Sequence, residues 1–486
     1  MSPRRLGKAV QSPSPSPLSP PPPSAPGRRV GRRYIIFAAL LLIVMIGTGI
    51  GAFLLLVRPF FLPSNSVIGR AFYVSSEILM GDGIKEEDAR GIADRLQVDM
   101  QNVQPPPTGK SYYLWLLADK DTTHKSDLLR PPLIQPPILL TNNLPVKADG
   151  TVHWTYPGDA QHNNLLAATS RLLITLEDAG RMPASYSTDR STWKYYAELP
   201  QAIIPNSPHK LTLRGLDHIR HIFYNEDNAR VLARYGGLDI WVSRDTQKLL
   251  EWATAARDDF DPMHPTAKYG QMHDLFTSIL DYLDGTSNVH VGVPPGTPVI
   301  PDRNIARISL LTVDSNRQIP TNFANDPFGD LDHLKVHVDE LNLAPDATQD
   351  IHQLAEEISV AIFNASQWLT CARADAKQLF YMTLNLPPPS IATCQVAQSR
   401  AQCANQPAQD LDVCILPQSQ STTVCANQLT QDLNCLLDDL VTQITNAYLG
   451  QLDPVTYTIT PGVRQAHNEA QQLDTFDITK NLPTSL

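Results

Sequence analysis

Two histidines three residues apart, His218 and His221, have a spacing that could bind a metal ion. On a helix, side chains three positions apart lie on one face, so both imidazoles could reach the same ion. Asp217 and Asn225 lie close by in the sequence, but the spacing indicates no third ligand. We therefore treat His218 and His221 as candidate metal ligands, with an ordinary polar helix face as the alternative.

A second pair, His333 and His337, lies in a segment of different periodicity. Leu334, Val336 and Val338 alternate with other residues, which predicts a strand. At about 3.3 Å per residue, the two rings would stand about 13 Å apart along that strand. We expect these histidines to be exposed side chains rather than ligands of one ion.

All six cysteines lie in the C-terminal quarter of the chain: Cys371, Cys394, Cys403, Cys414, Cys425 and Cys435. Zinc sites use paired thiolates two to four residues apart, and these spacings, about ten residues or more, supply no such pair. An even number of cysteines in an oxidising compartment indicates disulfides. We expect all six to be paired, and a bridge between Cys371 and Cys435 is one of the fifteen possible pairings.

The sequence shows none of the common motifs for a nucleophile, a catalytic metal or a phosphate. There is no G-x-S-x-G, H-E-x-x-H, P-loop or C-x-x-C-H. Acidic pairs such as Asp258-Asp259 could act as acid and base only in a geometry that the sequence does not define. We predict no catalytic residue and no cofactor, and a hydrolase such as a glycosidase stays open.

The elements that position these residues are organised around an apolar segment, residues 34–57. It carries no charge and, at about 1.5 Å per residue, is long enough to cross a hydrocarbon core of about 30 Å. Seven Arg and Lys residues and no acidic residue precede it, so the positive-inside rule predicts a cytoplasmic N-terminus and an extracytoplasmic body. The sequence thus predicts a single-pass protein of the plasma membrane, with a cleaved signal peptide as the alternative.

The charge of the chain restricts its partners. Without the seven basic residues of the N-terminal arm, 32 Lys and Arg remain against 49 Asp and Glu, a formal charge of about −17. This balance disfavours nucleic acid and anionic lipid, and favours a protein partner or an uncharged or cationic ligand. The arm, residues 1–33, is rich in Ser and Pro and is predicted to be disordered. Gly47 and Gly51 share one face of the predicted span and could form a homodimer contact.

Short strands separated by turns are predicted between residues 64 and 204. Apolar residues alternate at 152–156, and residues 112–117 and 172–176 are rich in β-branched, aromatic and other apolar residues. Turn residues separate these runs, for example Pro105-Pro106-Pro107 and Asp149-Gly150. This pattern is typical of an antiparallel sandwich or barrel.

Several short motifs follow one another in this region: Leu96-Gln97-Val98, Gly109 to Leu116, Asp149-Gly150, and Ile174-Thr175-Leu176-Glu177 with Pro183 soon after. In this order, residues 94–200 resemble the C-terminal extracytoplasmic domain of the anti-sigma-K factor family. Members of that family join such a β-domain, through one membrane span, to a cytoplasmic zinc-binding domain that holds a sigma factor. Residues 1–33 contain no Cys and no His, so the resemblance implies a fold and a location but not that activity.

From Leu211 the apolar period becomes helical, which predicts an α-helical domain over residues 211–475 with a Cys-containing insert at 386–425. The clearest helix is expected after Pro345, where apolar residues recur at three and four, and it should end before Pro387. Further helices are expected around residues 216–232, 241–252, 272–283, 424–449 and 465–473. Disulfides would staple one end of this bundle.

Together these features predict a membrane-anchored multidomain protein with a transmembrane helix, an antiparallel β-sandwich or barrel, and a mainly α-helical bundle with disulfides. The expected function is a membrane-tethered extracytoplasmic binding or sensing module without enzymatic activity. One alternative is an extracytoplasmic hydrolase or metal-dependent enzyme around His218 and His221. The other is a degenerate anti-sigma-like regulator.

Overall fold

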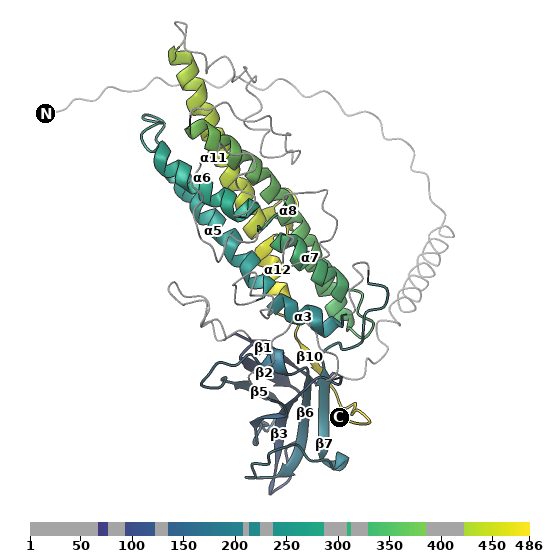
Figure 1. Ribbon diagram of the computed structural model, residues 1–486. Helices are drawn as coiled ribbons and strands as arrows, with labels where there is room; N and C mark the ends of the chain where they lie inside the picture. The colour runs from purple at the N-terminus through teal and green to yellow at the C-terminus, as the bar shows by residue number, and fades with distance from the viewer. Residues whose placement is uncertain are drawn as a thin grey trace, which may run out of the picture. The chain divides into compact units, whose positions relative to one another are not determined.

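Segments rich in β-branched and aromatic residues form two antiparallel sheets in the computed structural model (Figure 1). The structure describes residues 67–75, 93–121, 135–207, 213–223, 237–285, 309–312, 329–384 and 422–486, all within one unit, Asn65–Leu486. The strand order is β10-β1-β2-β5 in the first sheet and β4-β3-β6-β7 in the second. The strands are β1 (Gly69–Val74), β2 (Arg95–Met100), β3 (Lys110–Leu117), β4 (Ile138–Thr141), β5 (Val152–Tyr156), β6 (Arg171–Asp178), β7 (Trp193–Glu198) and β10 (Phe476–Ile478).

The second sheet is buried on both faces along β3. Tyr112, Leu114 and Leu116 face the main hydrophobic core. The alternate residues of β3 pack in a second cluster, against which Leu482 and Leu486 of the C-terminal segment lie. A strand covered on both faces needs apolar residues at every position, which explains the unbroken run in β3.

The C-terminal end of the chain returns to the sheets. β10 pairs with β1, with Ala71 opposite Phe476. Just beyond β10, Thr479 and Tyr196 of β7 exchange two backbone hydrogen bonds of 3.0 Å, which join the two sheets along one edge. The sequence pattern did not predict β10, because three residues are too few to show a period.

Segments in which apolar residues recur every three and four positions form the helices. Their bounds are α2 (Leu165–Ala168), α3 (Gly215–Phe223), α5 (Leu238–Asp259), α6 (Tyr269–Asp284), α7 (Asp330–Leu341), α8 (Gln349–Thr383), α11 (Thr422–Leu449) and α12 (Val463–Ala470). A two-stranded hairpin, β8 (Gln451–Leu452) and β9 (Ile459–Thr460), connects α11 to α12.

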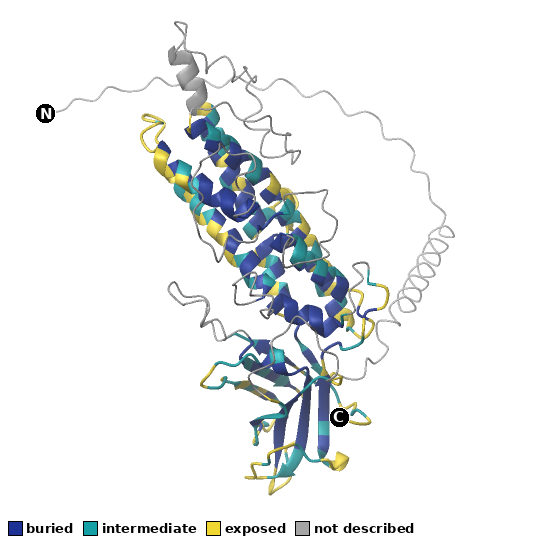
Figure 2. Ribbon diagram, in the orientation of Figure 1, coloured by how far each residue is buried: buried dark blue, intermediate teal, exposed yellow. Residues whose placement is uncertain are grey.

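Four long helices form the centre of the helical part. α5 packs on α6, α6 on α8, α8 on α11, and α11 on α5, so each helix contacts two neighbours. α12 covers α8 and α5, while α7 lies against α8 and α3. Figure 2 shows the inner faces of these helices as buried. The main core is continuous from the sheets into the bundle, because both contribute to one cluster of buried side chains.

The predicted fold class is wrong in its membrane component. Within the described ranges, no helix combines the length and apolar character that a bilayer span requires. The longest, α8, has 35 residues but carries charges such as Glu356, Glu357 and Arg373. The segment predicted to span the membrane, residues 34–57 with Gly47 and Gly51, lies outside the described residues, as does the arm 1–33.

The predicted disulfide pattern is wrong as well. Cys435, half-buried on α11, is a free thiol, so the six cysteines do not all pair and the bridge from Cys371 to Cys435 does not form. A thiol on a packed helix can serve as a small apolar side chain, which needs no bond. Cys371 on α8 is disulfide-bonded, but no disulfide joins two cysteines whose side chains the structure describes. The remaining side chains, those of Cys394, Cys403, Cys414 and Cys425, lie outside that part.

Candidate functional site: a fully buried polar helix

Helix α3 is buried along its whole length although nearly half of its residues are polar. All nine residues of Gly215–Phe223 are buried, and Asp217 and His218 have no exposed surface. Figure 2 shows the helix dark blue throughout. Since burial of a charge without a partner is costly, the polar side chains of α3 must be compensated by neighbouring elements.

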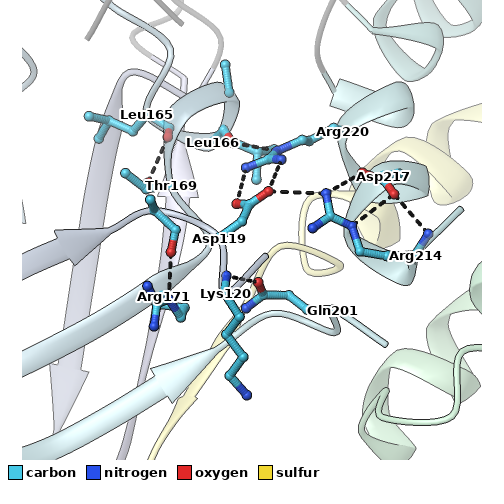
Figure 3. A network of polar contacts seen from close by, with 12 residues as sticks. Asp119, Lys120, Leu165, Leu166, Thr169, Arg171, Gln201, Arg214, Asp217 and Arg220 are labelled. Atoms are coloured by element: carbon cyan, nitrogen blue, oxygen red, sulfur yellow. Dashed lines mark hydrogen bonds and ion pairs between the residues drawn. The ribbon is translucent and has the colours of Figure 1, made fainter. Parts of the chain in front are cut away.

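The charge of Arg220 on α3 is compensated by an acidic residue, Asp119, that follows strand β3. Asp119 accepts two hydrogen bonds of 2.8 Å from the Arg220 guanidinium and one of 3.2 Å from Arg214 Nη2. Arg214, just before α3, also donates to both carboxylate oxygens of Asp217, at 2.9 and 3.1 Å. Figure 3 shows the two carboxylates and two guanidiniums as one connected group.

This group, which we call the Asp119 network, contains Asp119, Arg214, Asp217 and Arg220 and is electrically balanced. Burial by itself would raise the pKa of Asp119, but the charge and hydrogen bonds of Arg220 outweigh it and lower that pKa. At Asp217 burial would also raise the pKa, but the hydrogen bonds and charge of Arg214 outweigh it and hold the pKa of the carboxyl below its usual value. Both carboxylates are therefore ionised at neutral pH, and neither can act as a proton donor there.

Backbone contacts tie the face of α3 that carries Arg220 to the helix before β6. Arg220 Nε donates to the carbonyl of Leu166 at 2.9 Å, and Leu166 belongs to the short helix α2. Thr169, which ends that helix, donates from its hydroxyl to Leu165 O at 2.7 Å. The Thr169 hydroxyl also lies 2.8 Å from the hydroxyl of Tyr73 on β1. Arg220 thus contacts the sheet region through both charge and backbone.

An adjoining face of α3 meets histidines from α7. His218 Nδ1 lies 2.9 Å from His337 Nδ1, and the ring of His221 packs against His337 with centroids 4.4 Å apart at 82°. The ring of His333 lies 4.8 Å from that of His337. The strand predicted for this segment is wrong, because it forms helix α7, which brings the two rings together.

The structure thus places His218 and His221 beside a third imidazole, that of His337. His221 Nδ1 is 3.3 Å from His337 Nδ1 and 3.2 Å from His337 Nε2. Among the described residues, no group of three His, Cys, Asp or Glu side chains is arranged to hold a metal ion. The metal at His218 and His221 stays a prediction.

Close packing fixes the position of α3. A Cβ on Gly237, which precedes α5, would lie 2.0 Å from the carbonyl oxygen of Ile222. A Cβ on Gly215 would lie 3.0 Å from side-chain atoms of Pro200 and Ala344. At the C-terminal end of α3, the backbone of Gly237 therefore lies closer than any residue with a side chain would allow, and at Gly215 a side chain would force its neighbours to shift.

A second buried polar pair, which the sequence did not indicate, joins α5 to α12. His467 Nδ1 lies 2.7 Å from Asp239 Oδ2, and Gln471 donates to the same oxygen at 3.1 Å. The hydrogen bond that His467 donates to the Asp239 carboxylate raises the pKa of His467. An aspartate that orients a histidine occurs in hydrolase active sites, but here a second side chain of α12 shares the oxygen, as expected of a contact that fixes one helix to another.

Sequence spacing missed both His337 and the Asp119 network. Asp119 and Arg220 are 101 residues apart, and no local motif connects them. The pairing of Arg214 with Asp217 could have been predicted from the sequence, because two opposite charges three residues apart at the start of a helix form a recognisable spacing.

Comparisons with known proteins give no further assignment for this arrangement. No protein-family model matches the chain, and no curated protein or solved structure is similar enough to match it. The resemblance of residues 94–200 to the anti-sigma-K factor family therefore stays a prediction.

Proposed function

We propose that the chain is a non-enzymatic binding or sensing protein, in which helix α3 transmits a change in the sheet region to the helical bundle. The observation that carries the proposal is the complete burial of α3 between two polar contact sets. The Asp119 network connects it to the sheets, and His337 connects it to α7.

A helix held in this way cannot shift relative to the sheet region without also shifting relative to α7. If Arg220 shifts away from Asp119, two charges with little exposure lose their partners, at a cost of several kcal/mol. A shift of α3 also changes the contact of His218 with His337. A ligand that alters the sheet side would therefore alter α7, which is how coupling between sites arises physically.

The Asp119 network offers no chemistry of its own, which favours binding over catalysis. Its carboxylates are held ionised by guanidiniums, whereas a general acid or base needs a pKa near the working pH. The overall acidity of the chain favours a protein partner with basic residues or another cationic ligand.

A double-mutant cycle across α3 tests the coupling. Asp119→Asn and His337→Gln remove contacts that α3 makes with two different elements, and their effects on the free energy of unfolding would be measured singly and together by urea denaturation. We expect an interaction energy of at least about 0.5 kcal/mol, because distant independent sites add within that margin. A cycle between His337→Gln and Asp178→Asn, an exposed residue paired with Lys110, should be additive. Additivity across α3 would contradict the proposal.

The enzyme alternative is tested by metal analysis of the purified protein. A stoichiometric metal that is lost in His221→Ala would favour a metal-dependent enzyme around His218 and His221. No metal in either protein would leave the binding function as the better account.

A further inference from the structure

The hairpin between α11 and α12 exposes apolar side chains on a well-ordered backbone. Leu452 and Ile459 lie directly opposite each other across the two strands and are 56% and 57% exposed. At the tip, Val455 and Tyr457 are 83% and 80% exposed. Single exposed apolar residues are common, but a contiguous set on one short element indicates an interaction site.

The base of this hairpin is fixed by two glycines and a glutamine. Gly450 has φ of +84°, and a Cβ there would lie 2.6 Å from Thr460 O; a Cβ on Gly462 would lie 2.6 Å from Ala447 O. The Gln465 side chain donates to Leu449 O at 2.7 Å and accepts from the amide of Gly462 at 2.9 Å. The direction in which the hairpin projects is therefore set by the ends of the two helices.

The tip is also held in one conformation. Asp453 Oδ1 accepts from the amides of Val455 and Thr456 at 2.8 and 3.3 Å, and the Tyr457 amide donates to Asp453 O at 2.9 Å. Tyr457 has φ of +55°, a region that a bulky residue rarely adopts. Such strained backbone positions occur preferentially at functional sites.

Helix α8, which contacts the base of the hairpin, also exposes apolar side chains. Asn364 donates to Pro461 O, next to the base of the hairpin, at 3.3 Å. Val360 lies one turn before Asn364 on the same helix face and is 49% exposed, and Phe363 is 54% exposed. We call the set Val360, Phe363, Leu452, Val455, Tyr457 and Ile459 the hairpin patch.

The charges around the hairpin patch are mainly acidic. Glu356 and Glu357 are exposed on α8 within one turn of Val360, and Asp453 lies in the hairpin itself. Glu469 on α12 is close to Glu357, because burial first and the Glu357 charge second raise the pKa of Glu469. Arg464, exposed in the first turn of α12, is a basic residue on the same elements.

We propose that the hairpin patch is the docking site for an amphipathic protein segment that carries Lys and Arg beside its apolar side chains. An exposed, preorganised apolar surface supplies affinity, and the acidic border selects a basic partner. A second copy of the chain would place the same acidic border against itself, which is unfavourable. The inference adds a partner class to the proposed binding function and does not depend on coupling through α3.

The test uses a synthetic 18-residue amphipathic helix of Leu and Lys as the probe, with a matched helix of Leu and Glu as its control. Binding to the full chain would be measured by fluorescence anisotropy at two salt concentrations. We expect the Leu and Lys helix to bind, with Kd rising at higher salt, and the Leu and Glu helix to bind at least tenfold more weakly.

Variants locate the site. Val455→Ser with Tyr457→Ser should weaken binding of the Leu and Lys helix at least tenfold, whereas Met263→Ser, at an 82% exposed position elsewhere, should leave Kd unchanged. Equal binding by the double variant would overturn the proposal, as would equal binding of both helices. Concentration-dependent dimerisation lost in the double variant would also overturn it, because the patch would then serve a second copy.

Failure here is separable from failure of the proposed function. The peptide assay measures binding at the hairpin patch, whereas the cycle across α3 measures the free energy of unfolding of variants that keep the hairpin patch unchanged. The cycle across α3 can therefore succeed or fail independently of the peptide result.

Discussion

Helix α3 and the hairpin between α11 and α12 depart from ordinary burial in opposite directions. α3 buries Asp217, His218, Arg220 and His221 completely or nearly so, while the hairpin exposes apolar side chains over most of their surface. In α3, Arg220 is paired with Asp119, which follows β3, and Asp217 with Arg214, just before the helix. In the hairpin the backbone is fixed by hydrogen bonds while the side chains contact little of the chain.

The difference indicates what each region is for. A buried, compensated charge is expensive to separate, so it fixes the relative position of the elements that supply it. An exposed apolar side chain on a rigid backbone loses little entropy on binding, so it is suited to a partner. We therefore propose a connecting role for the α3 region and a recognition role for the hairpin.

Removing the acidic partner of α3 should have the largest effect. Asp119→Ala leaves the guanidiniums of Arg220 and Arg214 partly unpaired in a buried site, and we expect a loss of about 3–5 kcal/mol in the free energy of unfolding. Urea denaturation at pH 7 measures this loss. Asp178→Ala, which removes an exposed carboxylate, should produce no measurable change. A similar effect from both substitutions would show that burial at Asp119 is irrelevant.

At Asp474, a buried acid without a paired guanidinium, removing the carboxylate should stabilise the protein instead. Asp474 is fully buried, burial raises its pKa well above the usual value, and its Oδ1 has no hydrogen-bond partner within the described residues. An acid with a raised folded-state pKa binds its proton more tightly when folded, so its contribution to stability declines as pH rises above about 4. Asp474→Asn should therefore increase the free energy of unfolding at pH 7 by about 1–3 kcal/mol.

The pH dependence provides the control for that variant. Near pH 3.5 Asp474 is largely protonated in both states, and the advantage of Asn should shrink toward zero. Asp119 has a lowered pKa, so its stabilising contribution is present above about pH 4 and is lost on further acidification. A gain in Asp474→Asn that is the same at pH 3.5 and pH 7 would contradict the assignment of a buried neutral acid.

Relieving the strain at the hairpin tip should have a smaller effect on stability. Tyr457→Gly removes a side chain that is disfavoured at positive φ, and we expect the free energy of unfolding to rise by about 0.5–1 kcal/mol. Val455→Gly, at a neighbouring position without positive φ, should lower it instead. If both variants lose stability, Tyr457 makes contacts in the folded chain that its exposure does not suggest.

The smallest stability effect is expected at the apolar tip itself. Val455→Ser should change the free energy of unfolding by less than about 0.5 kcal/mol, because the side chain is mostly exposed. Val463→Ser, the same change at a buried position on α12, should cost about 2 kcal/mol or more. Thermal denaturation followed by circular dichroism compares the two, and equal losses would place Val455 in the core.

Long regular periods were predictable from the sequence. Apolar residues recur at three and four positions over many turns before Pro387, and α8 (Gln349–Thr383) forms there. The run at 112–117 lies in β3. In both cases burial along the whole element imposes one period, and that period is visible in the residues themselves.

Shorter elements and contacts distant in sequence were not predictable. In α7, Leu331, Leu334, Val338 and Leu341 carry the helical period and are buried, but the alternation of Leu334, Val336 and Val338 competes with it over the same residues. The Asp119 network depends on tertiary proximity between residues about 100 positions apart. No local pattern could assign Asp119 to Arg220, because the pairing exists only once the sheet region and α3 have packed together.

The central claim is that α3 connects the sheet region to the bundle, and hydrogen exchange of the Asp119→Asn variant tests it most directly. We predict that amide protection falls in α3 and also in α7, whose His337 contacts His218 of α3. Loss of protection confined to the segment around Asp119 and the neighbouring strand, with α7 unchanged, would contradict the claim.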